Sequence, residues 1–128
     1  MAGAELLSYV RLYADEDGET HFEDVAIAAD ERRAVSGALL MMSDLIPVAG
    51  LEFRLVVEDH PGDEPHNAPR RQFIITLAGD HEVTVSDGET RAFGPGSVVL
   101  VEDIEGKGHL TRPTGPSPRI TLFAPLPL

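Results

Sequence analysis

Short segments in which apolar residues alternate with polar ones, or in which β-branched residues dominate, recur along most of the chain. A period of two predicts β-strands that bury one face. The predicted strands are Ser8–Tyr13, Phe22–Ala28, Leu51–Glu58, Arg71–Ala78, Glu82–Ser86, Thr90–Phe93, Ser97–Glu102, His109–Arg112 and Arg119–Leu126. Turns such as Gly94-Pro95-Gly96 separate the later strands, because they supply the backbone conformations that a chain reversal needs. This even spacing predicts an antiparallel sandwich or a small barrel.

The segment Ala29–Gly50 lacks this alternation. Its central part, Glu31–Met42, favours a short helix that Ser36-Gly37 interrupts. A long segment that crosses a sheet or covers the end of a barrel is the open alternative. Met41 and Met42 are expected to fill space in the core, because methionine adapts to irregular gaps.

Length and composition narrow the class of protein. A chain of 128 residues predicts one domain, residues 1–128, and the absence of cysteine excludes disulfide bonds and thiolate sites. The net charge of −12 repels phosphates, so neither nucleic acid nor a membrane is expected as a partner. The first residues lack signal-peptide features and no run of about 18 apolar residues occurs, which favours a cytoplasmic location.

Two groups of residues in the second half of the chain carry recognisable spacings. Gln72 is followed by six residues and then Gly79, and His66 lies upstream of it. Further on, the turn Gly94-Pro95-Gly96 opens a strand, and the sequence Gly106-Lys107-Gly108-His109 follows that strand. Both groups resemble the two motifs of the cupin superfamily. The resemblance implies an all-β fold, a cupin-type antiparallel β-barrel or jelly roll, with a site inside it.

The chain departs from the family pattern at several motif positions. Gln72 stands where the family has glutamate, and Ala68 stands where it has its second histidine. Pro113 replaces the asparagine of the second motif, and the spacer before His109 is two residues longer than usual. The resemblance therefore predicts the fold more specifically than the activity, since one fold hosts many functions.

His66, Gln72 and His109 are the residues that match ligand positions of the family, so they are the candidate catalytic and metal-binding residues. A divalent ion (iron, manganese, nickel or zinc) is one interpretation, with His21, His60 or Asp103 as completing ligands. The other interpretation is a metal-free site in which a histidine acts as general acid and base, and Gln72 binds a carbonyl or enol.

Neighbouring residues have expected supporting roles. Arg70 and Arg71 are candidates for binding a substrate carboxylate or phosphate. Glu102 or Asp103 is a candidate for orienting the ring of His109. His81 follows a turn and is expected to be a solvated hairpin residue.

These residues predict an enzyme that acts on a small organic molecule, with an anionic substrate as one candidate. Isomerase, cyclase, lyase and metal-dependent dioxygenase chemistry all stay open. The alternative is a cupin that binds or senses a small ligand without turnover. A homodimer is also expected from the resemblance, with the strand Ser8–Tyr13 as a candidate for exchange between subunits.

Overall fold

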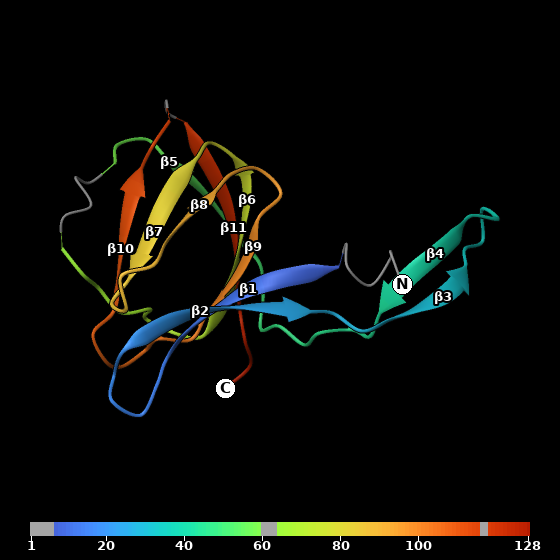
Figure 1. The fold of residues 1–128 in the computed structure, drawn as a ribbon. Coiled ribbons are helices and arrows are strands. Elements are labelled where there is room, and N and C mark those ends of the chain that lie inside the picture. The colour runs from blue at the N-terminus through green and yellow to red at the C-terminus, as the bar shows by residue number, and fades with distance from the viewer. Residues whose placement is uncertain (1–6, 60–63, 116–117) are drawn as a thin grey trace.

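The computed structural model describes residues 7–59, 64–115 and 118–128, and all regular structure in these ranges is β (Figure 1). The strands are β1 (Ser8–Ala14), β2 (Thr20–Ala26), β3 (Ala29–Arg33), β4 (Leu39–Ser43), β5 (Glu52–Val56), β6 (Gln72–Ala78), β7 (His81–Val85), β8 (Thr90–Phe93), β9 (Val98–Val101), β10 (His109–Pro113) and β11 (Arg119–Pro125). The all-β prediction is confirmed. Across these ranges, no helix has the length and apolar character required to cross a bilayer.

The strands form three sheets. A six-stranded sheet has the order β2-β1-β9-β6-β11-β5, a three-stranded sheet has the order β10-β7-β8, and β3 and β4 pair as a separate hairpin. Neighbouring strands are antiparallel, except that β1 and β9 run parallel. None of the sheets closes into a barrel.

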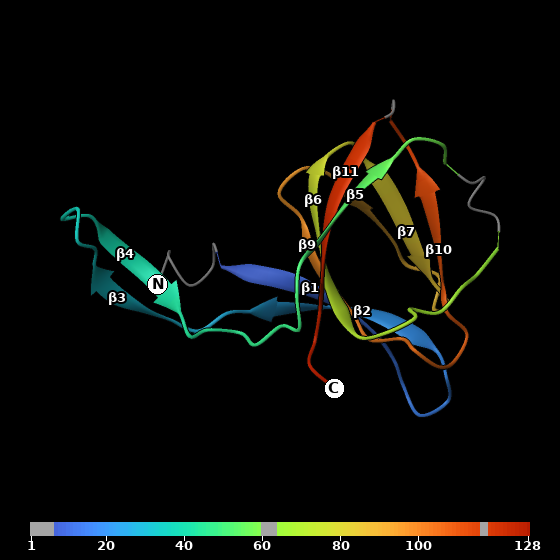
Figure 2. The same ribbon diagram turned by 180° about the vertical axis from the view of Figure 1, so that it is seen from behind.

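The six-stranded and three-stranded sheets face each other, and the main core lies between them (Figures 1 and 2). The buried residues of this core come from both sheets and from the loop that precedes β6: Leu12, Phe22, Ala68, Val83, Val85, Phe93, Val99 and Val101. On β6, Gln72, Ile74 and Thr76 face inward because side chains alternate along a strand. Phe73 packs on the opposite face with Leu100 and Ala124.

The prediction of a helix in Glu31–Met42 is wrong, because this segment forms the hairpin of β3 and β4. The residues that interrupt the helical pattern form the turn: Gly37 has a φ of 94°, and its backbone N–H donates to the carbonyl oxygen of Ala34. A glycine in this conformation ends a helix but suits a hairpin turn. The expected core role of Met41 and Met42 also fails: Met42 is 46% exposed, and the half-buried Met41 is not part of either core cluster.

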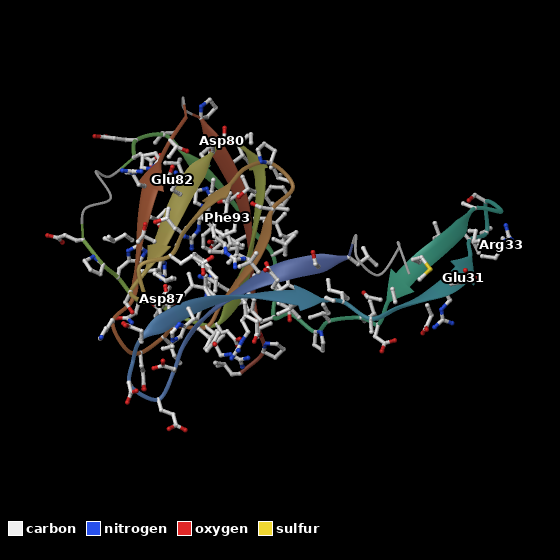
Figure 3. All side chains as sticks on the ribbon, in the orientation of Figure 1. Glu31, Arg33, Asp80, Glu82, Asp87 and Phe93 are labelled. Carbon is white, nitrogen blue, oxygen red and sulfur yellow. The ribbon has the colours of Figure 1, made fainter. Side chains whose placement is uncertain are left out.

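The hairpin extends away from the two facing sheets. Figures 1 and 2 show β3 and β4 as an arm joined to the rest of the chain by β2 and by the segment that leads to β5. Glu31 and Arg33 of this arm lie far from the facing sheets (Figure 3). We call residues 29–43 the arm.

Candidate functional site

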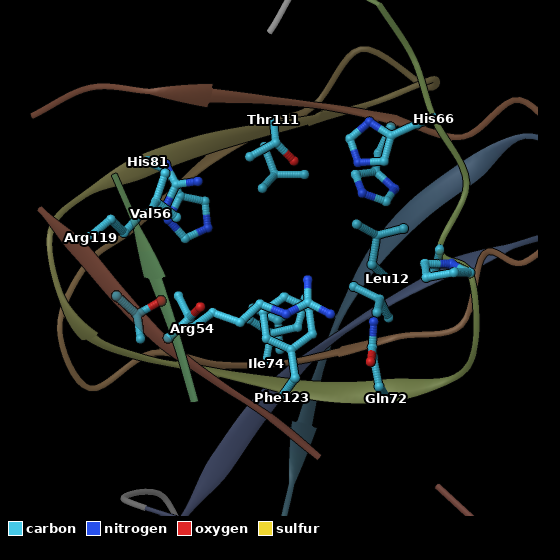
Figure 4. Close-up of a pocket in the computed structure, with 18 residues that line it drawn as sticks. Leu12, Arg54, Val56, His66, Gln72, Ile74, His81, Thr111, Arg119 and Phe123 are labelled. Atoms are coloured by element: carbon cyan, nitrogen blue, oxygen red, sulfur yellow. The ribbon is translucent and has the colours of Figure 1, made fainter. Parts of the chain in front are cut away.

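A cavity of about 330 Å³ lies between the facing sheets, and its volume is typical of a small-molecule site (Figure 4). The apolar part of its lining comes mainly from Leu12, Ile74, Val83, Val99, Val101 and Phe123. Its polar lining includes His66, Gln72, His81 and His109, together with Arg54, Arg119 and the hydroxyl-bearing Thr76, Thr111 and Thr121. The structure thus brings the three candidate residues His66, Gln72 and His109 to one cavity.

A buried hydrogen bond to a carboxyl group supports the imidazole of His109. Asp103 follows β9 and is fully buried, and its Oδ2 lies 2.5 Å from Nδ1 of His109, the first residue of β10. A carboxylate at this distance accepts a hydrogen bond from Nδ1–H. In the neutral form of the ring, this bond leaves the lone pair on Nε2. His109 is 7% exposed and lines the cavity, which places a base with a defined tautomer at the cavity wall.

The same aspartate holds the loop that carries His66. Its backbone carbonyl oxygen accepts hydrogen bonds from the N–H of Ala68 and from Nδ2 of Asn67, each at 3.2 Å. His66 forms two backbone hydrogen bonds of 2.9 Å with His109, and the centroids of the two rings lie 4.5 Å apart. Asp103 therefore positions both histidines, one through its side chain and the other through its backbone.

Gln72 lies at the start of β6 and is 2% exposed. Its Oε1 accepts a hydrogen bond of 2.9 Å from Nε of Arg70, which fixes the orientation of the amide. Arg70 itself is exposed and does not line the cavity, so it contacts the site through Gln72 rather than directly. Gln72 remains the group of this pair that faces the cavity.

Arg71 is placed differently from the expectation that it binds substrate. Its guanidinium pairs with Glu102, which also accepts from Nε of Arg11 at 2.5 Å, and Arg71 is absent from the cavity lining. Arg71 immediately precedes β6, whose first residue, Gln72, points inward, so by alternation the side chain of Arg71 points outward. Glu102 alternates outward in the same way, so Asp103 is the acid that orients His109.

His21, one of the other candidate metal ligands, does not lie at this end of the cavity. His21 bonds Asp15 and Asp87 at an exposed site, with N···O distances of 2.7 and 2.8 Å, and these carboxylates raise its pKa. His21 therefore does not complete a ligand set with His66 and His109. His60 lies outside the described residues.

His81 was expected to be solvated, and this expectation is wrong. The residue begins β7, is 8% exposed and lines the cavity. Burial lowers its pKa to about 4, and the positive charge of Arg119 acts in the same direction. His81 is therefore neutral at pH 7. The sequence places His81 directly after a Gly-Asp turn, which suggested an exposed residue. However, His81 alternates with Val83 and Val85, and this period of two indicates that all three side chains face inward.

Two arginines of the cavity lining were also missed. Arg119 begins β11 and forms two contacts of 3.2 Å with the carboxylate of Asp59. Arg54 of β5 donates from Nε to Glu52 at 2.5 Å, and its guanidinium lies 3.7 Å from the ring centroid of Phe123. Both guanidinium groups thus have a carboxylate partner within the protein.

The donor groups at His66, Gln72 and His109 fit a divalent metal poorly. In the parts of the chain that the structure describes, no group of three or more histidine, aspartate, glutamate or cysteine side chains is placed to hold an ion. The amide oxygen of Gln72 already accepts from the cationic Arg70, whose charge opposes a second cation beside it. We derive no chemical step through a metal.

Comparison of the chain with protein-family models gives no match, and comparison with curated proteins gives no similar sequence. The cavity and its residues are therefore the basis for the function proposed below.

Proposed function

We propose that this chain is a cupin-fold enzyme that acts on a small organic molecule in the cavity by acid/base chemistry of the isomerase or lyase type. The observation that carries the proposal is the buried pair of Asp103 and His109 at the cavity wall. The two facing sheets with a ligand-sized space between them support the cupin fold. A cavity of this volume has room for about ten water molecules, so the substrate is small.

His109 acts as the general base in this proposal. Nε2 removes a proton from a carbon next to a substrate carbonyl group. The electron pair of the broken C–H bond forms the carbon–carbon double bond of an enolate, and the π pair of the carbonyl group moves onto its oxygen. Asp103 stabilises the imidazolium that results, because its carboxylate is already bonded to Nδ1. The imidazolium then returns the proton to the opposite face of the same carbon or, where the enolate is conjugated with a further double bond, to the terminal carbon of that system. In an elimination, the β-substituent leaves with its bonding electron pair, and the imidazolium protonates it. Proton transfer of this kind contributes about 10²- to 10⁴-fold to a rate.

Gln72 binds the enolate oxygen in this mechanism. Its Oε1 is engaged by Arg70, so its Nε2 is the part of the amide left to donate to a substrate. A donor that is buried and fixed in place stabilises developing negative charge more strongly than water does. The ring of His66 packs on that of His109 and restricts its movement.

A cupin that binds a small ligand without turnover is the second candidate. The observation that favours it is the high proportion of apolar and threonine side chains in the lining, which suits binding and contributes no proton transfer. Both candidates require the same cavity, so only turnover separates them.

The test is a screen of small carbonyl compounds in D₂O, with deuterium incorporation at carbon followed by NMR. Exchange that is lost in His109→Asn and strongly reduced in Asp103→Asn supports the enzyme. Ligands that bind the wild-type chain and show no exchange or conversion favour the binding protein. Metal analysis of untagged protein, followed by titration with iron, manganese, nickel and zinc, checks the metal-dependent alternative.

We also propose that the chain forms a homodimer through its arm. β4 of the arm and β5 of the six-stranded sheet are both edge strands of five residues. Apolar side chains are exposed on each of them, including Met42 on β4 and Phe53 and Leu55 on β5. Unprotected apolar edges pair readily, and a two-stranded hairpin is marginally stable by itself. A second copy that pairs β4 with β5 covers both strands.

β1 offers a second copy no free edge. It pairs with β2 on one edge and with β9 on the other. The arm therefore replaces β1 as the element that we expect to contact the second copy.

A further inference from the structure

The cavity has a second polar end that the acid/base pair does not use. β7 and β10 are antiparallel, with His109 opposite Val85 and Pro113 opposite His81. His81 and His109 thus face the same cavity from positions four residues apart along the pair, which is about 13 Å at the usual rise per residue. Figure 4 shows His81 and Arg119 at one end of the cavity and His66 and Gln72 at the other.

His81 is a buried residue with one ring nitrogen that has no hydrogen-bond partner in the described parts of the chain. Its side chain is more than nine-tenths buried, and its Nδ1 has no hydrogen-bond partner among the described residues. Buried polar atoms are almost always bonded, so an exception at a cavity wall points to a ligand. The imidazole is neutral at pH 7, so it offers one donor and one acceptor.

Both arginines at this end of the cavity already have a carboxylate partner. Arg119 and Asp59 form a two-contact pair in which both side chains are mostly buried, and Arg54 is paired with Glu52. A carboxylate of the ligand placed here would compete with Asp59 for Arg119 and leave a buried negative charge without its own partner. An uncharged oxygen has no such cost and can still accept a hydrogen bond.

We propose that His81 and Arg119 form a second subsite that binds the uncharged carbonyl or amide oxygen of an elongated ligand whose reactive end lies at His109. An N–H of His81 donates to this oxygen, and guanidinium N–H groups of Arg119 that are not bonded to Asp59 are available as further donors. Only the placement of the reactive end of the ligand at His109 rests on the proposed function; the subsite at His81 and Arg119 does not. It narrows the ligand class from small organic molecules, anionic or neutral, to neutral carbonyl compounds.

The test uses two matched pairs of probes, hexanamide with hexanoate and benzamide with benzoate, titrated into ¹⁵N-labelled protein at pH 7. We expect each amide to shift the imidazole resonances of His81 and to bind at least about tenfold more tightly than its carboxylate. His81→Leu should weaken amide binding by about tenfold, and His81→Gln should retain most of it because glutamine keeps a donor and an acceptor. His21→Gln, outside the cavity, is the control and should leave binding unchanged.

Three outcomes would overturn the subsite. The first is carboxylates that bind as tightly as the amides, the second is amide binding that does not change in folded His81→Leu, and the third is no binding of either amide at millimolar concentration. Amide binding at His81 without deuterium exchange of any carbonyl compound would keep this subsite and remove the proposed enzymatic function. The subsite at His81 and the enzymatic function at His109 can therefore be disproved independently of each other.

Discussion

At the scale of single residues, Asp103 has the largest predicted effect on the proposed chemistry. Replacing it by asparagine keeps the shape but removes the carboxylate charge, and the amide can either accept from Nδ1–H or donate to an unprotonated Nδ1 of His109. We expect deuterium exchange of substrate to fall by about 10²-fold or more, because the base loses its defined tautomer. Imidazole ¹⁵N spectra provide a direct check. An unprotonated Nε2 should be seen in the wild type and a mixture of tautomers in Asp103→Asn.

His81 predicts a characteristic pH dependence of stability. Its pKa is lowered to about 4 in the folded chain, so between that value and the ordinary 6.5 the unfolded chain binds more protons. The stabilisation is complete above about pH 6.5 and is lost as the pH falls toward 4. The loss corresponds to about 3 kcal/mol.

Urea unfolding of the wild type and of His81→Gln at about pH 7 and about pH 4.5 measures how much His81 contributes to the pH dependence of the free energy of unfolding. As the pH falls over this interval, the free energy of unfolding should decrease more in the wild type than in the variant. Both proteins have the same carboxylates, so the effect of those groups cancels when the two decreases are subtracted. Equal losses would mean that His81 is not buried as a neutral ring.

The sequence could predict His66, Gln72 and His109 as cavity residues because their positions match the two motifs that resemble those of the cupin superfamily. It could not predict which partners they have. Asp103 and Glu102 are adjacent and equally acidic, and only the alternation at the end of β9 sends one inward to His109 and the other outward to Arg11. Arg54 and Arg119 were missed for the same reason, since their inward direction depends on the pairing of β5 with β11.

At the scale of elements, the bridge between the His66 loop and β10 depends on Gly108. Its φ is +75°, and an added Cβ would lie 2.6 Å from the carbonyl oxygen of His66. Gly108→Ala should therefore displace the loop and destabilise the chain by more than the ~1 kcal/mol that a positive φ alone costs. Gly88→Ala is the matched control, because Gly88 has a φ of +100° and open space around its Cβ position.

Chemical denaturation of both alanine variants tests this prediction. The loss of stability in Gly108→Ala should exceed that in Gly88→Ala, and only Gly108→Ala should weaken ligand binding in the cavity. Similar losses for the two variants would show that the loop adapts to the added methyl group.

The strands were more predictable than the arm. Nine predicted strands correspond to strands of the two facing sheets, because one apolar face against a core produces a clear period of two. β4, with the sequence Leu-Leu-Met-Met-Ser, has no such period, since neither of its faces packs on the core. This run of good helix formers therefore had the sequence pattern of a helix. Its backbone pairing with β3 makes it a strand instead.

At the scale of the whole molecule, the distribution of exposed apolar side chains is uneven. Many of them lie on the arm, on β5 and on the segment between the two, including Leu39, Leu45, Phe53 and Leu55. A net charge of −12 opposes association in general, so a dimer must be driven by a specific contact. The free edges of β4 and β5 are the surfaces on which backbone pairing and apolar burial coincide.

Met42→Lys is the variant that tests the dimer most cleanly. Met42 is 46% exposed and lies opposite Asp30 in the hairpin, so a lysine there keeps a favourable cross-strand pair and preserves the arm. We expect the wild type to be a dimer at micromolar concentration in sedimentation velocity, and Met42→Lys and Leu55→Lys each to raise the dimer Kd by about tenfold or more. Ala92→Lys, on the exposed face of β8, adds the same charge far from the arm and should leave the Kd unchanged. A monomeric wild type, or a dimer whose Kd is the same in all three variants, would contradict pairing through the arm.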